Sequence, residues 1–201
     1  MTHATRNPAA QRSLSLCAAA LLLVGIAGCG TVTFTGVPAS RLAPVAGPWT
    51  TRTVDRNQVS LSVPSNWNAG DPWLSPSSFT DLVASFSNQP LSPPCTTGPM
   101  SLSCGPPLTS LRSGAVLVEV FQNAFPGWTI DSQPGIPTMV AGLRARVAAQ
   151  GDCGGLGADT GHTEVVALAP ANYIEITICS RGADDAVATR ILASVRVTRG
   201  G

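Results

Sequence analysis

His162 is the residue best suited to acid–base chemistry, because it is the only histidine after the first 28 residues. It lies in the sequence Asp159-Thr160-Gly161-His162-Thr163-Glu164. Asp159 or Glu164 could orient its imidazole as a general base for a serine nucleophile. The sequence contains no Gly-x-Ser-x-Gly motif, which presents the serine in many hydrolases. We therefore expect His162 to be a solvated loop residue, with a hydrolase as the alternative, and we assign no catalytic residue.

Two glutamates occur inside apolar segments. Glu119 alternates with Val118 and Val120, which predicts that it lies on the face opposite these valines. Buried together, Glu119 and Glu175 would form a carboxylate pair with shifted pKa values. We favour instead an exposed position for each, or an ion pair with an arginine of the same region (Arg144, Arg146 or Arg181).

Three tryptophans, Trp67, Trp73 and Trp128, fall in segments that are predicted to be loops. Loops commonly carry binding residues, and the indole ring is suited to stacking on a ligand or to anchoring a protein partner. These residues are our candidates for ligand binding. The alternative is that they close the ends of the hydrophobic core.

Composition excludes several kinds of chemistry. The chain has no lysine, which rules out Schiff-base catalysis, the lysine of phosphate-binding loops and Ser-x-x-Lys acylation. A single histidine does not make a typical zinc site, so we expect no metal and no other cofactor. The 173 residues after position 28 contain ten arginines and eleven acidic residues. A domain without a basic field is not expected to bind nucleic acid.

The most specific motif lies near the N-terminus. Arg6 and Arg12 precede an apolar run over residues 14–26. This run is shorter than the roughly twenty residues of a membrane span and is typical of a signal peptide. It ends in Ile26-Ala27-Gly28-Cys29, which resembles the lipobox of bacterial membrane lipoproteins. An ordinary secretory signal, cleaved near Ala27-Gly28, is the alternative.

The lipobox resemblance implies that residues 1–28 are removed and that Cys29 is linked to diacylglycerol through a thioether. Two acyl chains are what stable membrane anchoring requires. We therefore expect the protein to be lipid-anchored in the cell membrane and to face the extracytoplasmic side. Residues 29–52 are rich in Thr, Pro, Gly and Ala and are predicted to form the lipidated cysteine and a flexible tether. Residues 53–201 would then form one globular domain.

Four cysteines follow Cys29, and in an oxidising compartment an even number favours disulfides. Three pairings are possible, and sequence alone does not choose among them. The order of the loops favours one bond within a proline-rich loop and one between a glycine-rich loop and a strand end. A zinc site is disfavoured because the chain has no Cys-x-x-Cys motif. The favoured pairs are Cys95–Cys104 and Cys153–Cys179.

Hydrophobic alternation predicts an α+β fold with a single, mostly antiparallel sheet of about six strands and a C-terminal covering helix. Residues 79–86 fit either a helix or a strand, and we favour the strand slightly. Residues 183–194 have the pattern of the helix, with acidic residues near its start. The predicted strands are 59–63, 115–121, 138–150 with a bulge at Gly142, 163–168, 173–179 and a short 195–197.

Two patches, Val63-Pro64-Ser65-Asn66-Trp67 and Ile191-Leu192-Ala193-Ser194-Val195, resemble the PsbP-like fold, a superfamily that includes many actinobacterial lipoproteins. The resemblance implies an antiparallel sheet flanked by helices over roughly residues 52–199, and it implies no function. We expect a non-enzymatic envelope lipoprotein that binds an envelope protein or an apolar ligand through its tryptophan loops. The alternatives are an extracytoplasmic hydrolase using His162 and a purely structural envelope component.

Overall fold

The computed structural model describes residues 42–43, 45, 47–54, 58–73, 79–97, 102–149, 153–183 and 185–198. These residues all belong to one compact unit, Ala39–Gly201. The predicted signal peptide, the lipidation site Cys29 and the tether up to residue 41 lie outside the described residues.

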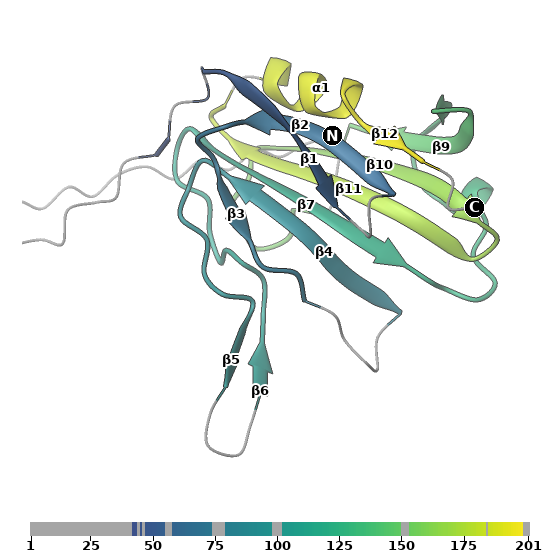
Figure 1. Ribbon diagram of the computed structural model, residues 1–201, viewed down its shortest axis with the longest axis horizontal. Helices are drawn as coiled ribbons and strands as arrows, with labels where there is room; N and C mark the ends of the chain where they lie inside the picture. The colour runs from purple at the N-terminus through teal and green to yellow at the C-terminus, as the bar shows by residue number, and fades with distance from the viewer. Residues whose placement is uncertain are drawn as a thin grey trace, which may run out of the picture. The chain divides into compact units, whose positions relative to one another are not determined.

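The larger sheet has seven strands in the order β3-β4-β7-β11-β10-β9-β8, and every pairing in it is antiparallel (Figure 1). The α+β class with an antiparallel sheet is therefore confirmed, whereas the expected number of about six strands in a single sheet is corrected. The strands are β3 (Asn68–Gly70), β4 (Thr80–Ser87), β7 (Ala115–Asn123), β8 (Ile136–Val140), β9 (Leu143–Ala148), β10 (Thr160–Ala169) and β11 (Asn172–Arg181).

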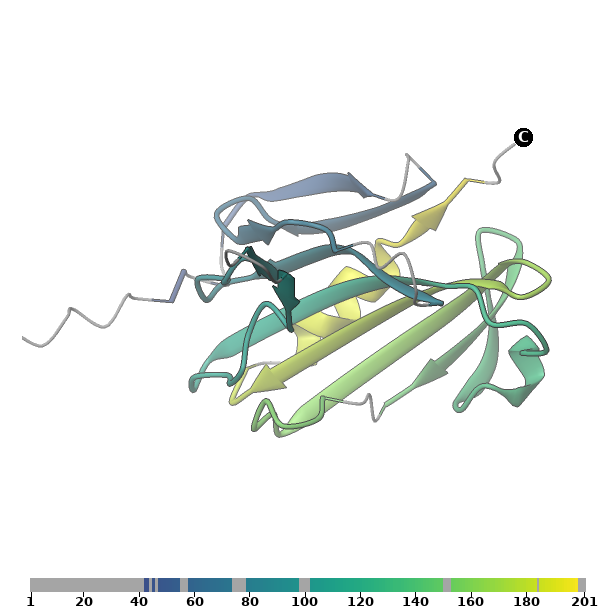
Figure 2. The same ribbon diagram turned by 90° about the horizontal axis from the view of Figure 1, so that it is seen from below.

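A smaller three-stranded sheet has the order β1-β2-β12. Together with helix α1 it packs on one face of the larger sheet (Figure 2). Two further pieces lie outside these layers, a hairpin and a single turn of 3₁₀ helix. The elements are β1 (Trp49–Val54), β2 (Val59–Pro64), β12 (Arg196–Val197), α1 (Asp185–Ala193), the hairpin β5 (Cys95–Thr97) and β6 (Leu102–Cys104), and the turn η1 (Ile130–Ser132).

The main core lies between the two layers. Val59, Leu61 and Val63 alternate along β2, so one face of that strand is apolar and completely buried. From the larger sheet, every second residue of β7 and β11 meets this face, and α1 adds Ala188 and Ile191. The alternating residues of the larger sheet are Val116, Val118, Val120, Ile174, Ile176 and Ile178.

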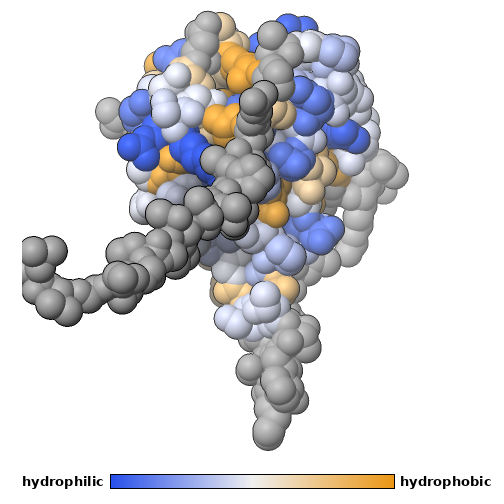
Figure 3. Space-filling model, turned by 90° about the vertical axis from the view of Figure 1, so that its left-hand side faces the viewer, coloured by the Kyte–Doolittle hydropathy of each residue, from blue (hydrophilic) through white to orange (hydrophobic). Residues whose placement is uncertain are grey.

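Both favoured disulfide pairs are confirmed. Cys153–Cys179 ties the glycine-rich loop to β11, within a second hydrophobic cluster on the opposite face of the larger sheet. Cys95–Cys104 closes the β5–β6 hairpin, which extends away from the sheets; Figure 3 shows it at the bottom, below a body of mixed hydrophilic and hydrophobic residues.

The predicted strand over residues 138–150 is instead two strands, β8 and β9, and Gly142 is part of their turn rather than a bulge. Ala141 and Gly142 have φ angles of +49° and +79°. Two successive residues with positive φ match the right-handed twist of a hairpin, so the chain reverses here. The alternation of side chains is similar on both sides of the turn, which is why the pattern resembled one long strand.

Regular structure is present before residue 53, the position at which we predicted the globular domain to begin. β1 starts at Trp49 and pairs along its whole length with β2. The Arg190 guanidinium lies 3.9 Å from the centre of the Trp49 ring, so a cation–π contact joins β1 to α1. Still earlier, the Ala43 amide donates a 2.8 Å hydrogen bond to the Asn88 carbonyl. These tertiary contacts fix a segment whose composition resembles a linker.

Candidate ligand-binding pocket

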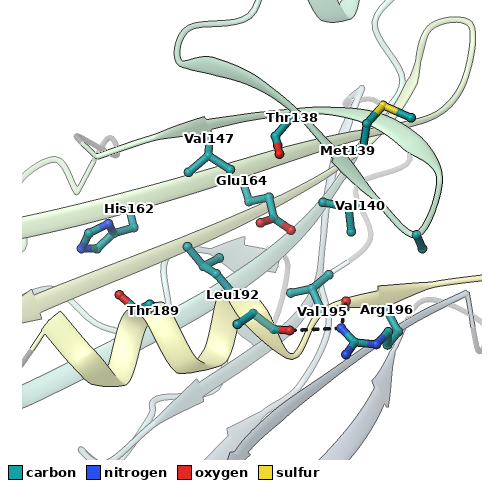
Figure 4. A pocket seen from close by; sticks show the side chains of 12 residues that line it. Thr138, Met139, Val140, Val147, His162, Glu164, Thr189, Leu192, Val195 and Arg196 are labelled. Carbon is teal, nitrogen blue, oxygen red and sulfur yellow. Dashed lines mark hydrogen bonds between the residues drawn. The ribbon is translucent and has the colours of Figure 1, made fainter.

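A pocket of about 470 Å³ lies between α1, β10 and the β8–β9 hairpin (Figure 4). Its walls are mainly apolar, and its polar side chains are those of Thr138, His162, Glu164, Thr189 and Arg196. The lining residues are Thr138, Met139, Val140, Ala141, Val147, His162, Glu164, Thr189, Leu192, Ala193, Val195 and Arg196.

Strand register places Glu164 in this pocket. On the neighbouring strands it pairs with Ile176 of β11 and Val147 of β9. Cross-strand partners lie on the same face of a sheet, and Ile176 belongs to the main core. Glu164 therefore lies on the apolar, helix-covered face, and Figure 4 shows its side chain projecting from β10 toward α1, near Leu192 and Val195.

The Glu164 carboxyl is the most constrained polar group of the pocket. The residue is only 5% exposed. Its Oε1 has no hydrogen-bond partner among the described residues. Burial raises the pKa of Glu164 to about 7, because removal from water disfavours the charged form. Near neutral pH both the protonated and the ionised form of this carboxyl are therefore populated.

His162 is not the loop residue that we expected. β10 begins at Thr160, so His162 lies inside the strand, paired with Ile178. Its side chain is only 19% exposed, and Nε2 lies 3.3 Å from Oδ1 of Asp185 in the first turn of α1. The pairing of β10 with β11 continues back to Thr160, so the strand begins before the predicted strand 163–168. The imidazole therefore links β10 to the start of the helix.

Arg196 lies where the pocket meets the end of α1. Its Nη1 donates hydrogen bonds to the carbonyls of Ala193, at 3.1 Å, and Val195, at 2.8 Å. A cation at this position compensates the negative end of the helix dipole. The guanidinium therefore uses its hydrogen bonds on backbone carbonyls. No contact between it and Glu164 is observed among the described residues.

The lining residues offer no serine or cysteine nucleophile. Thr138 and Thr189 are the hydroxyl-bearing residues of the pocket, and the hydrogen bond of His162 goes to Asp185 rather than to either of them. The general-base arrangement that nucleophilic catalysis requires is therefore not formed in this pocket.

The three tryptophans lie in different environments, and their role as ligand-binding candidates stays a prediction. Trp67 is 5% exposed and packs in the main core, because burying its large indole ring is favourable. Trp73 is half-buried and bonds through its backbone to Leu82. Trp128 is 40% exposed and stacks on Phe125 at 4.1 Å. None of the three lines the pocket.

Glu119 and Glu175 lie on the other face of the larger sheet. Glu119 is half-buried beside a second pocket of about 310 Å³, and burial raises its pKa to about 7. Glu175 Oε2 accepts a 2.7 Å hydrogen bond from Asn123. The arginines that we considered as partners are engaged elsewhere: Arg144 and Arg146 pair with Asp131, and Arg181 donates to the Leu111 carbonyl.

Among the described residues, no cluster of three or more acidic, histidine or cysteine side chains has the arrangement of a metal site. Nor does any helix there have the length and apolarity needed to cross a bilayer. No protein-family model matches the chain, and no curated protein is significantly similar to it.

Sequence analysis identified Glu164 only as a partner for His162, and it did not predict the pocket. The available signal was a charged residue two positions before Val166, in a strand whose even-numbered residues face the core. The walls come from three segments that are distant in sequence, so their meeting depends on the tertiary structure.

Proposed function

We propose that this protein is a membrane-anchored envelope lipoprotein whose domain binds a small, largely apolar ligand in the pocket between α1 and the larger sheet. The observation that carries the binding proposal is a pocket of about 470 Å³ with aliphatic walls and few polar groups. Small-molecule sites have this size and character. Through this pocket the domain acts as a binding protein rather than as an enzyme.

The location rests on the sequence. The lipobox at Cys29 supports a diacylglycerol anchor on the extracytoplasmic face of the cell membrane. The two disulfides are in keeping with an oxidising compartment, since such bonds are rare in the cytosol. We further propose that the domain is a variant of the PsbP-like fold, supported by its antiparallel sheet and its C-terminal covering helix.

The geometry favours binding over the hydrolase alternative. A hydrolase that uses His162 needs a nucleophile within hydrogen-bond reach of the imidazole. The imidazole of His162 contacts Asp185, and the pocket lining supplies no serine or cysteine. A purely structural role is the remaining alternative, and a binding experiment separates it from the proposed function.

The test fills the pocket without disturbing the core. Thr189 lies on the exposed side of α1 and lines the pocket, so Thr189→Trp should occupy its volume. We expect the full chain to bind the neutral dye N-phenyl-1-naphthylamine saturably, with at least tenfold weaker affinity in Thr189→Trp. The measurement is a fluorescence titration.

The matched control is Thr53→Trp, which adds the same side chain at an exposed position of β1 outside the pocket. It should bind the dye as the unmodified chain does. Equal affinities for all three proteins, or no saturable binding, would contradict the proposed site and favour a structural role.

A further inference from the structure

Some polar groups of the pocket have hydrogen-bond partners within the protein, and one buried oxygen has none in the described part of the chain. His162 interacts with Asp185, and Arg196 donates to two backbone carbonyls. Glu164 alone presents a buried oxygen with no partner among the described residues. When Glu164 is ionised, a ligand that satisfies this oxygen must carry a hydrogen-bond donor, because a carboxylate only accepts.

The surroundings of Glu164 favour a charged donor over a neutral one. Its neighbours across the strands are the aliphatic Val147 and Ile176. An ionised carboxylate in such surroundings is costly unless it is paired with an opposite charge. Arg196 is the permanently charged cation of the lining, and hydrogen bonds to backbone carbonyls hold it at the end of the helix. The missing positive charge therefore has to come with the ligand.

The pocket also limits what kind of cation can enter. Metal ions need several oxygen, nitrogen or sulfur ligands, and the described residues show no cluster that supplies three of them. The aliphatic walls instead favour an apolar body attached to the cation. A free carboxylic acid would place like charges together, and a polyol would bury hydroxyl groups without partners.

We propose that the pocket binds an amphipathic organic amine, with its ammonium group donating to Glu164 and its apolar body packed against Leu192, Val195 and Val140. This inference rests on the proposed binding function and names the class of ligand. The volume of about 470 Å³ sets the size of the body, which is that of a small organic molecule rather than a peptide chain.

The affinity for an amine should depend on pH. The titratable and charged groups near Glu164 are His162 on its own strand, Asp185 in the first turn of α1, and Arg196 in β12, just after the end of α1. β9 and β11 contribute the aliphatic Val147 and Ile176, while the β8 side contributes no charged residue to the lining. Ionisation of Glu164 as the pH rises through about 7 should strengthen amine binding.

The test compares three probes with the same six-carbon body: hexylamine, 1-hexanol and hexanoate. Each is titrated into the full chain at pH 8, with affinity measured from NMR shifts of α1 and β8–β9 residues. We expect hexylamine to bind at least tenfold more tightly than 1-hexanol, with hexanoate weakest. In Glu164→Gln the preference for hexylamine over 1-hexanol should fall below threefold.

Glu119→Gln is the matched control, because it makes the same substitution at a half-buried carboxyl on the opposite face of the same sheet. It should retain the full preference for the amine. If Glu164→Gln does not fold, the pH dependence of binding to the unmodified chain still tests the amine inference. Its affinity for hexylamine should rise at least fivefold between pH 5.5 and pH 8.5, while its affinity for 1-hexanol stays constant.

The outcomes separate the two proposals. Equal binding of hexylamine and 1-hexanol at pH 8, or a hexylamine preference that survives Glu164→Gln, overturns the amine inference. If N-phenyl-1-naphthylamine still binds in a way that Thr189→Trp prevents, the proposed binding function stands without it. If no probe binds and the dye does not bind either, both proposals fail.

Discussion

At the scale of single residues, the most informative side chain is Glu164, which lies in a row of aliphatic residues across β9, β10 and β11. A carboxyl in such a position weakens the fold at neutral pH, because its ionised form is poorly solvated. Residues of this kind are commonly kept for function rather than for stability. The energetic cost can be measured directly.

We predict that Glu164→Gln stabilises the protein in a pH-dependent way. A carboxyl whose pKa is raised from 4.5 to about 7 on folding contributes a free energy of unfolding that falls as the pH rises through this interval. Glutamine cannot ionise. The variant should therefore gain about 1–3 kcal/mol relative to the unmodified chain between pH 4.5 and pH 8. Urea denaturation at both pH values measures this, and a difference that does not change with pH would contradict it.

Burial also explains the residues that sequence analysis misplaced. Indole and imidazole rings both occur in exposed loops and in buried positions, so the residue type alone does not predict whether a Trp or a His is buried. Trp67 is in the core because the chain after β2 turns inward there. His162 is half-buried because the pairing of β10 with β11 continues as far as Thr160.

At the scale of elements, the β8–β9 hairpin and α1 form opposing walls of the pocket. The hairpin depends on the positive φ angles of Ala141 and Gly142. The helix is held by the Arg190–Trp49 contact on one side and by His162 at its start. The helix wall is thus held by one contact outside the pocket, Arg190–Trp49, and by one that the lining residue His162 makes.

The two disulfides should differ in their effect on stability. Cys179 is 1% exposed in a hydrophobic cluster, and its bond to Cys153 spans 26 residues. Replacing this pair by alanines should lower the free energy of unfolding by about 2–4 kcal/mol. Cys95–Cys104 spans 9 residues in a hairpin whose described residues belong to none of the three hydrophobic clusters.

Replacing Cys95 and Cys104 by alanines should therefore lower the global free energy of unfolding by less than about 1 kcal/mol, because the hairpin can open locally while the sheets stay folded. Urea denaturation of both double variants makes the comparison. Equal losses would show that the hairpin is part of the cooperative unit.

At the scale of the whole molecule, attachment and binding are assigned to different parts of the chain. The proposed anchor is Cys29, and the ordered domain is described from Leu42 onward. Because the pocket lies within the domain, its binding properties should not depend on the lipid.

We predict that Cys29→Ala abolishes labelling by a fatty-acid probe and releases the protein from membranes. The reason is that stable attachment needs the two acyl chains that this thiol would carry. Metabolic labelling followed by membrane fractionation measures both effects. Cys17→Ala is the control and should keep both the label and the membrane association; continued labelling of Cys29→Ala would refute the anchor.

The sequence by itself determined the features that depend on local order. Alternation along residues 59–63 and 115–121 predicted β2 and β7, and the acidic start of residues 183–194 predicted α1, because these patterns report a single face of one element. The order of the loops favoured the two disulfides that are found. Only the tertiary structure decided the division into a seven-stranded and a three-stranded sheet, the β8–β9 turn and the pocket around Glu164. These depend on register and on contacts between distant segments, and a local pattern carries no information about which strand will lie beside another.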